Sequence, residues 1–189
     1  MADLVPDLTL ARSTPAMADL VPLADASLAK AQEEAVQKTK QFLEQYLNKP
    51  DGIDVNVREI PATNDSVFAV SDAIKLESRY RTKYTKDREI ALYILITNGH
   101  SWNKDALGFA YHNTSIVLFG KHIAEHSGKF RKPRRSDLQS RVIQHELGHL
   151  LGLVNTGAEL QSDHQDQEHG KHCKNKWCLM YYLTDTDDY

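Results

Sequence analysis

The sequence is poor in cysteine, nearly balanced in charge and free of long hydrophobic runs. Only two of its 189 residues are cysteines, so at most one disulfide can form within the chain. No apolar stretch approaches the roughly 20 residues that a helix needs to cross a bilayer, which excludes a transmembrane segment. The formal net charge of −3 excludes the basic surface by which proteins bind nucleic acid. The length allows one domain with a core of its own, and we expect a monomer.

Residues 1–25 lack any amphipathic pattern. Prolines and aspartates interrupt every apolar run in this stretch, so it does not contain the uncharged core of a signal peptide. The phrase MADLVP at residues 1–6 recurs at residues 17–22, and this duplication is too short to indicate a structural repeat. We therefore predict a flexible N-terminal arm at residues 1–25 and a single domain at residues 26–189.

The motif HELGH at residues 145–149 carries the chemistry of the sequence. On a helix, with about 100° per residue, His145 and His149 lie on one stripe and can bind the same metal ion. Glu146 projects beside that ion and can take a proton from metal-bound water. The alternative is a chance motif in an ordinary amphipathic helix, with both histidines in solvent. The helical context favours a zinc hydrolase.

The chain departs from the expected pattern six residues after His149. HELGHLLGL resembles the start of the metzincin signature HExxHxxGxxH, but Asn155 stands where the third histidine is expected. Asparagine is a poor zinc ligand, so the third donor must come from elsewhere. The candidates, in order of preference, are His172, His164, and then His169 or Asp166.

The segment His172-Cys173-x4-Cys178-x-Met180 resembles the archaemetzincin signature at every fixed position. From about residue 31 to residue 182, the chain also resembles secreted or lipid-anchored zinc metalloproteases of Bacteroidetes-type bacteria. The resemblance implies that His172 is the third Zn²⁺ ligand and that Met180 forms a Met-turn beneath the metal. It also implies that Tyr182, or Tyr181 in its place, reaches the metal or the oxyanion.

The two cysteines depart from the archaemetzincin pattern, because no further Cys-x2-Cys follows them. We therefore do not expect a closed second zinc site. Cys173 and Cys178 can form a small disulfide in an oxidising compartment, and we predict this bond. Free thiols, or a mixed metal site with His164, Asp166 or His169, are the alternatives. The resemblance implies an extracytoplasmic protein without a targeting segment in this sequence, and a cytoplasmic location is the alternative.

Apolar periodicity predicts three helices. The first is expected at residues 27–49 and the second after Ser71, with a buried stripe that extends to Tyr84. The third carries the HELGH motif and is expected to begin at a capping box of Ser136 and Gln139 and to end near Gly152.

Strands are predicted at residues 53–57, 90–96, 107–111 and 115–119. The second strand is apolar without alternation, so we expect both of its faces to be covered. The order of elements predicts an α/β (α+β) fold, a twisted mixed sheet packed on helices. By the metzincin resemblance, residues 107–111 form the edge strand, where a peptide or protein substrate would add as an extended strand.

These patterns predict a zinc-dependent metallopeptidase in which Glu146 is the general base. One alternative is an inert zinc-binding module whose cleft is blocked by the insertion at residues 154–171, and another is a metallohydrolase that does not act on peptides. Four further histidines lack ligand spacing, and we interpret them as surface or loop residues. They are His100, His112, His122 and His126.

Overall fold

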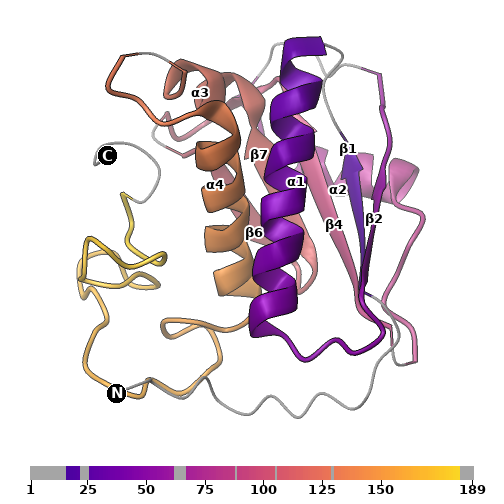
Figure 1. Ribbon diagram of the computed structural model, residues 1–189. Helices are drawn as coiled ribbons and strands as arrows, with labels where there is room; N and C mark the ends of the chain where they lie inside the picture. The colour runs from indigo at the N-terminus through magenta and orange to yellow at the C-terminus, as the bar shows by residue number, and fades with distance from the viewer. Residues whose placement is uncertain are drawn as a thin grey trace.

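A twisted five-stranded sheet forms the centre of this computed structural model, which describes residues 16–21, 26–61, 67–87, 89–104, 106–128 and 130–183 (Figure 1). The strands span Ala16–Val21 (β1), Ile53–Val57 (β2), Ala91–Thr97 (β4), Gly108–Tyr111 (β6) and Ser115–Phe119 (β7). Their order is β2-β1-β4-β7-β6, with parallel pairing except for the antiparallel β6 at one edge. The predicted mixed sheet and its edge strand are confirmed.

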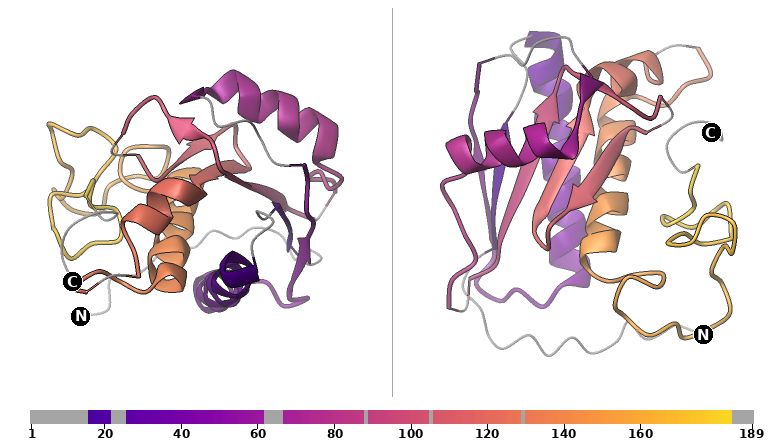
Figure 2. Two further views of the ribbon diagram at one scale, coloured as in Figure 1. Left: turned by 90° about the horizontal axis from the view of Figure 1, so that it is seen from above. Right: turned by 180° about the vertical axis from the view of Figure 1, so that it is seen from behind.

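Helices cover both faces of this sheet. Helices α1 (Ala26–Tyr46) and α4 (Arg135–Leu150) lie on one face, and α2 (Val70–Tyr80) lies on the other (Figure 2). A short helix, α3 (Gly120–Glu125), follows β7, and two-residue strands β3 (Val67–Phe68) and β5 (His100–Ser101) pair beside the main sheet. None of the described helices is both long and apolar enough to cross a membrane.

β4 shows why a strand without alternation belongs in the centre of the sheet. Ile94 and Ile96 pack in the apolar cluster beneath α1 and α4, whereas Tyr93 and Leu95 pack in the cluster beneath α2. Successive side chains point to opposite faces, so a strand covered on both sides must be apolar at nearly every position. The prediction that both faces of this strand are covered is confirmed.

The structure corrects the arm prediction for residues 16–21. These residues form β1, which pairs in parallel with β2 on one side and β4 on the other. A strand with two neighbours is stabilised by backbone ladders that no local pattern reveals. The rest of the predicted arm, residues 1–15 and 22–25, lies outside the described residues. The single domain at residues 26–189 stays a prediction.

Two predictions about the helices were also wrong. α4 begins at Arg135 with Arg134 as its N-cap, and neither Ser136 nor Gln139 forms the predicted capping box. Both side chains are instead buried in the packed protein near the start of the helix. Tyr84 follows the end of α2 and is exposed, because α2 ends at Tyr80.

A buried ion pair fixes α2 to the strands that lead to the cleft. Arg81 donates to the Glu77 carboxylate at 2.5 Å and to the Ala91 carbonyl at 2.8 Å. It also donates to the hydroxyls of Thr114 and Ser115 in the β6–β7 turn and in β7. Burial acts to raise the pKa of Glu77, but hydrogen bonds from Arg81 and Ser115 outweigh it and leave that pKa lowered. This network holds the turn after β6 at a set place.

Candidate metal centre and active site

The first two candidate ligands come from successive turns of α4. The Nε2 atoms of His145 and His149 lie 3.1 Å apart. The Nδ1–H of His145 donates to the Leu179 carbonyl at 2.8 Å, so its Nε2 carries the lone pair. Four-residue spacing on a helix therefore places both rings together, as the motif predicted.

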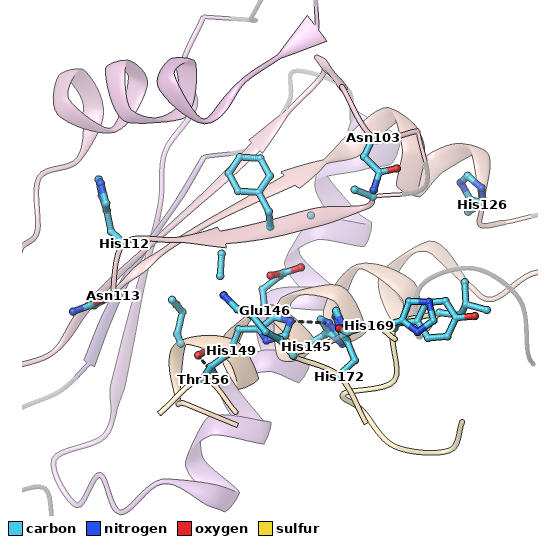
Figure 3. A pocket seen from close by; sticks show the side chains of 18 residues that line it. Asn103, His112, Asn113, His126, His145, Glu146, His149, Thr156, His169 and His172 are labelled. Carbon is cyan, nitrogen blue, oxygen red and sulfur yellow. Dashed lines mark hydrogen bonds between the residues drawn. The ribbon is translucent and has the colours of Figure 1, made fainter. Parts of the chain in front are cut away.

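A third histidine from the C-terminal segment joins this pair. The ligand atoms of His145, His149 and His172 all lie within 4.8 Å of one another. The His172 ring stacks on His145 at a centroid distance of 5.2 Å and meets His149 edge-on at 5.1 Å. Figure 3 shows the three histidines gathered together, between His112 and Asn113 on one side of the cleft and His126 on the other. The other candidates, Asp166 and His169, are not members of this group in the described part of the chain, and neither is His164.

The chemistry of these three donors fits a zinc ion. Zinc binds neutral imidazole, and burial lowers the pKa of His145. Burial, the two neighbouring histidines and the Lys171 ammonium lower the pKa of His149 to about 3. Tetrahedral ligands about 2.0 Å from zinc lie roughly 3.3 Å apart, close to the observed Nε2–Nε2 separation of 3.1 Å. The lowered pKa values favour neutral rings at His145 and His149, and the separation of their Nε2 atoms is close to the spacing that zinc requires.

Glu146 lies beside the histidines, on the wall of a cleft of about 1090 Å³. The cleft runs between α4 and the edge strand β6, whose Gly108, Phe109 and Ala110 line it. Only 6% of Glu146 is exposed, and its carboxylate points toward β6 (Figure 3). A carboxylate next to paired histidines can accept a proton from a bound water molecule.

Met180 lies directly beneath the histidine-bearing turn of α4. A Cβ atom added at Gly148 would meet the Met180 sulfur at 2.3 Å. Met180 is 3% exposed and packs with Val154 and Cys173 in a third apolar cluster. Glycine in the HELGH motif therefore lets the C-terminal segment approach the helix at the level of the paired histidines.

Tyr182, the second predicted catalytic residue, lines the same cleft but contacts His169. Its ring stacks on the His169 ring at a centroid distance of 3.5 Å, with the planes 7° apart. Tyr181 packs against Tyr182 at 4.9 Å. A direct role for Tyr182 at the metal or the oxyanion stays a prediction.

The predicted disulfide is not formed in the structure. Cys173 and Cys178 are not joined by a disulfide, although they are close neighbours. Burial and the adjacent Cys173 thiol raise the pKa of Cys178. Spacing alone brings the two sulfurs together but does not determine their oxidation state, which explains the difference.

Sequence reasoning missed several residues of the cleft. His112, His126 and Lys171 line it, although no helical pairing marks them in the sequence. His112 has a positive φ of 50° and lies in the turn between β6 and β7. His122 was interpreted as a surface or loop residue, but it is 6% exposed and its Nδ1 lies 3.2 Å from the Ala106 carbonyl. The proximity of His112 and His126 to the cleft comes from tertiary packing alone.

The arrangement of the sheet, of the helix that bears the histidines and of the segment beneath it recurs in solved structures. The chain has the fold of metzincin-like zinc metalloproteases. Archaemetzincin from Methanopyrus kandleri is similar over 97% of this chain and 91% of its own, with 14% identity and a TM-score of 0.57. The predicted resemblance to archaemetzincins is therefore confirmed at the level of the fold.

A second solved structure, metalloproteinase-II from Bacteroides fragilis, is also similar. The match covers 93% of this chain and 48% of that protein, with 16% identity and a TM-score of 0.53. This chain thus spans about half the length of that protein. Identities this low show a shared fold and leave substrates and activity open.

Comparison of sequences alone adds little. No family model matches the chain. An FMN-dependent NADH:quinone oxidoreductase of Streptomyces avermitilis is 51% identical over 43 residues, which make up 23% of this chain and 20% of that protein. The chain thus matches about a fifth of that curated protein's length, and this short stretch does not show a shared family.

Proposed function

We propose that this protein is a zinc-dependent peptidase. The observation that carries the proposal is the convergence of His145, His149 and His172 beside Glu146, in a cleft bordered by an edge strand. The three imidazoles would hold Zn²⁺, which as a Lewis acid would polarise the scissile carbonyl and acidify a water molecule. The metzincin-like fold supports this proposal.

Within this proposal, the protein's own residues have distinct tasks. Glu146 accepts the proton of the attacking water and later donates it to the leaving amine, which suits a carboxylate aimed into the cleft. The backbone hydrogen bonds that orient His145 and His172 keep their Nε2 atoms directed inward. Met180 packs against α4 at Gly148, between the positions of His145 and His149. This is the place that a Met-turn would take.

A peptide substrate would bind beside β6. This strand pairs with β7 on one side and lines the cleft along its length. An extended peptide could add to its other side through backbone hydrogen bonds, with side-chain specificity from the cleft walls.

An inert zinc-binding module is the second candidate function. It requires the insertion at residues 154–171 to block access to the histidines. Thr156 and Lys171, at the two ends of this insertion, line the cleft, which nevertheless retains about 1090 Å³. A cleft of this volume can admit several residues of a peptide, and this favours the enzyme.

The proposal is tested with the isosteric change Glu146→Gln. The amide keeps the size of the side chain but cannot accept the proton, so hydrolysis of a denatured protein substrate should fall at least about a hundredfold. Zinc content, measured by metal analysis, should stay the same. Glu125→Gln is the matched control, because Glu125 is an exposed carboxylate at the end of α3. Activity near wild type in Glu146→Gln would remove its assignment as the general base.

A further inference from the structure

The third histidine is held by a segment without regular structure. Between residues 151 and 183, the structure assigns no helix and no strand, only an isolated bridge between Gln165 and Cys173. The place of His172 therefore depends on individual hydrogen bonds. These bonds converge on one carboxylate, that of Asp166.

Asp166 organises the turn that precedes His172. Its Oδ1 accepts the backbone N–H groups of Glu168 at 2.9 Å and His169 at 3.2 Å. Its Oδ2 accepts the Nδ1–H of His169 at 2.7 Å. Its own backbone N–H donates to the His172 carbonyl at 2.8 Å. Both ends of the turn are thus tied to the same residue.

This turn aims a carbonyl at the third histidine. The His169 carbonyl accepts the Nδ1–H of His172 at 2.8 Å, which leaves the His172 Nε2 lone pair for the metal. The ring of Tyr182 stacks on the His169 ring. The chain of contacts therefore runs from the Asp166 carboxylate through the backbone of residue 169 to the imidazole of His172.

We propose that Asp166 is a positioning residue for the third metal donor, acting through His169 and not as a ligand itself. The inference rests on the proposed zinc site. The carboxylate is already occupied by three hydrogen bonds within the turn, and Asp166 is outside the group of ligand atoms that lie within 4.8 Å of one another. A residue that orients a ligand typically contributes a factor of 10 to 100 to metal affinity.

Competitive chelator titration of the full chain measures the zinc dissociation constant without reference to activity. Asp166→Ala should weaken zinc binding about 10- to 100-fold. Asp166→Asn should weaken it less, because the amide oxygen can still accept backbone N–H groups. Asp163→Ala is the matched control, since Asp163 is an exposed aspartate of the same segment that pairs with Lys174, and it should leave the constant unchanged.

The absorption spectrum of the Co²⁺-substituted protein separates positioning from ligation. It should be retained in Asp166→Ala, because the same three imidazoles bind, and changed in His172→Ala. An Asp166→Ala protein that binds zinc as tightly as wild type overturns the inference, and so does one that loses affinity and spectrum as completely as His172→Ala. A wild-type protein that binds no zinc contradicts the proposed function itself.

The charge of the cleft wall carries a second, independent inference. Among the described residues that line the cleft, Glu146 is the one carboxylate and Lys171 is the one lysine or arginine. Lys171 is exposed and lines the same cleft as the three histidines. In the described part of the chain no ion pair joins Lys171 to an acidic side chain, whereas Lys174 pairs with Asp163 at 3.2 Å. The ammonium group is thus available to a ligand in the cleft.

We infer that Lys171 selects substrates with a carboxylate near the scissile bond. This inference deepens the proposed peptidase function and rests on it. The carboxylate can belong to an acidic side chain or to the C-terminus of a peptide. At a site open to solvent, one ion pair is worth up to about 1 kcal/mol, which is a preference of roughly two- to fivefold.

Paired peptides distinguish the two sources. One pair differs by Glu against Gln at positions flanking the scissile bond, and the other by a free C-terminal carboxylate against an amide. Wild type should prefer the charged member of one pair by roughly two- to fivefold in kcat/KM, and added salt should weaken the preference. Lys171→Gln should abolish this preference, while Lys174→Gln, the matched control, should keep it.

Affinity of the Glu146→Gln protein for the same peptides gives a second readout that needs no turnover. The same preference in affinity, lost when Lys171→Gln is added, supports the inference. The inference is overturned if both peptides of each pair have the same affinity and kcat/KM, or if a preference persists in Lys171→Gln. If wild type hydrolyses none of the peptides but the affinity preference holds, the proposed function fails and the carboxylate site stands.

Discussion

The two parts of the candidate metal centre are held in place by different forces. Residues 26–150 contain the helices and most of the sheet, with two apolar clusters on its two faces. Residues 151–183 have no helix or strand and share one small cluster around Val154, Cys173 and Met180. Two histidines come from the first part and one from the second. The site therefore joins a rigid frame, residues 26–150, to a segment, residues 151–183, whose shape depends on turns and single hydrogen bonds.

This difference indicates what the metal would do for the protein. Apolar burial and backbone ladders can maintain α4 without a ligand. The C-terminal segment has far less apolar surface to bury, so a metal ion that links His172 to α4 would provide much of its stability. Four changes can break or sharpen this contrast.

The largest effect is expected from His172→Ala. Loss of one of three imidazoles should weaken zinc binding about a thousandfold, which corresponds to about 4 kcal/mol. Hydrogen exchange should then rise in residues 160–183 and stay low in β4 and α4. Asn155→Ala is the control and should barely matter, because Asn155 is exposed. Strong zinc retention in His172→Ala, together with loss in His164→Ala, would move the third ligand into the insertion.

Ile143→Ala should act on the frame. Ile143 is fully buried in the cluster between α1, α4 and the sheet, so its truncation leaves a cavity and should lower the free energy of unfolding by about 2 to 5 kcal/mol. Zinc affinity of the folded protein should stay near wild type. Urea denaturation and chelator titration measure the two quantities. Ile74→Ala, at a partly exposed position of α2, should cost under about 1 kcal/mol.

Gly148→Ala should act where the two parts touch. Helix propensity favours alanine over glycine by about 1 kcal/mol, but the new methyl group would overlap the buried Met180 sulfur, and overpacking typically costs about 1 to 3 kcal/mol. The cost of the overlap with Met180 should exceed the gain in helix propensity, so Gly148→Ala should lower the thermal stability and weaken zinc binding. Adding Met180→Ala should relieve part of the penalty, which a double-mutant cycle would detect. A stabilising effect of Gly148→Ala alone would show that the segment can move away freely.

The smallest effect is expected for Asp137→Asn, within the frame. Burial acts to raise the pKa of Asp137, but hydrogen bonds from Lys38 on α1 and from Arg134 outweigh it and lower that pKa below its ordinary value of 3.8. A lowered carboxyl pKa contributes stability above pH 3.8 that is lost as the pH falls through the folded-state pKa. Because this site is partly exposed, Asp137→Asn should cost under about 1 kcal/mol near neutral pH. In urea denaturation, the difference from wild type should shrink in acid, and a difference that is constant with pH would contradict this origin.

The sequence predicted the frame well because its signals are periodic. The helical spacing of His145 and His149, the apolar run of β4 and the two short strand patterns of β6 and β7 are local patterns with a direct structural meaning. β1 was missed because its stability comes from two neighbouring strands that are distant in sequence. Pairing with strands that are distant in sequence produces no recognisable pattern within the six residues of β1.

The site was predictable only in part, for the same physical reason. The grouping of His172 with the helical pair followed from resemblance, whereas the Asp166 turn and the place of Lys171 in the cleft arise from the folded path of residues 151–183. Irregular segments are specified by side-chain and backbone hydrogen bonds, which have no period in the sequence. The free thiols of Cys173 and Cys178 depend on redox conditions, which a sequence does not encode.

The path of the chain after α4 also shows why a long insertion can be tolerated next to a metal centre. Gly152, Val154 and Asn155 all have positive φ, so the chain turns sharply and the side chain at the signature position is exposed to solvent. His172 lies roughly four times as far along the chain from His149 as Asn155 does. The entropy of closing a flexible loop grows only with the logarithm of its length, so this extension costs about 1 kcal/mol. Homologous chains could therefore vary widely in the length of this loop and still bring the same three histidines together.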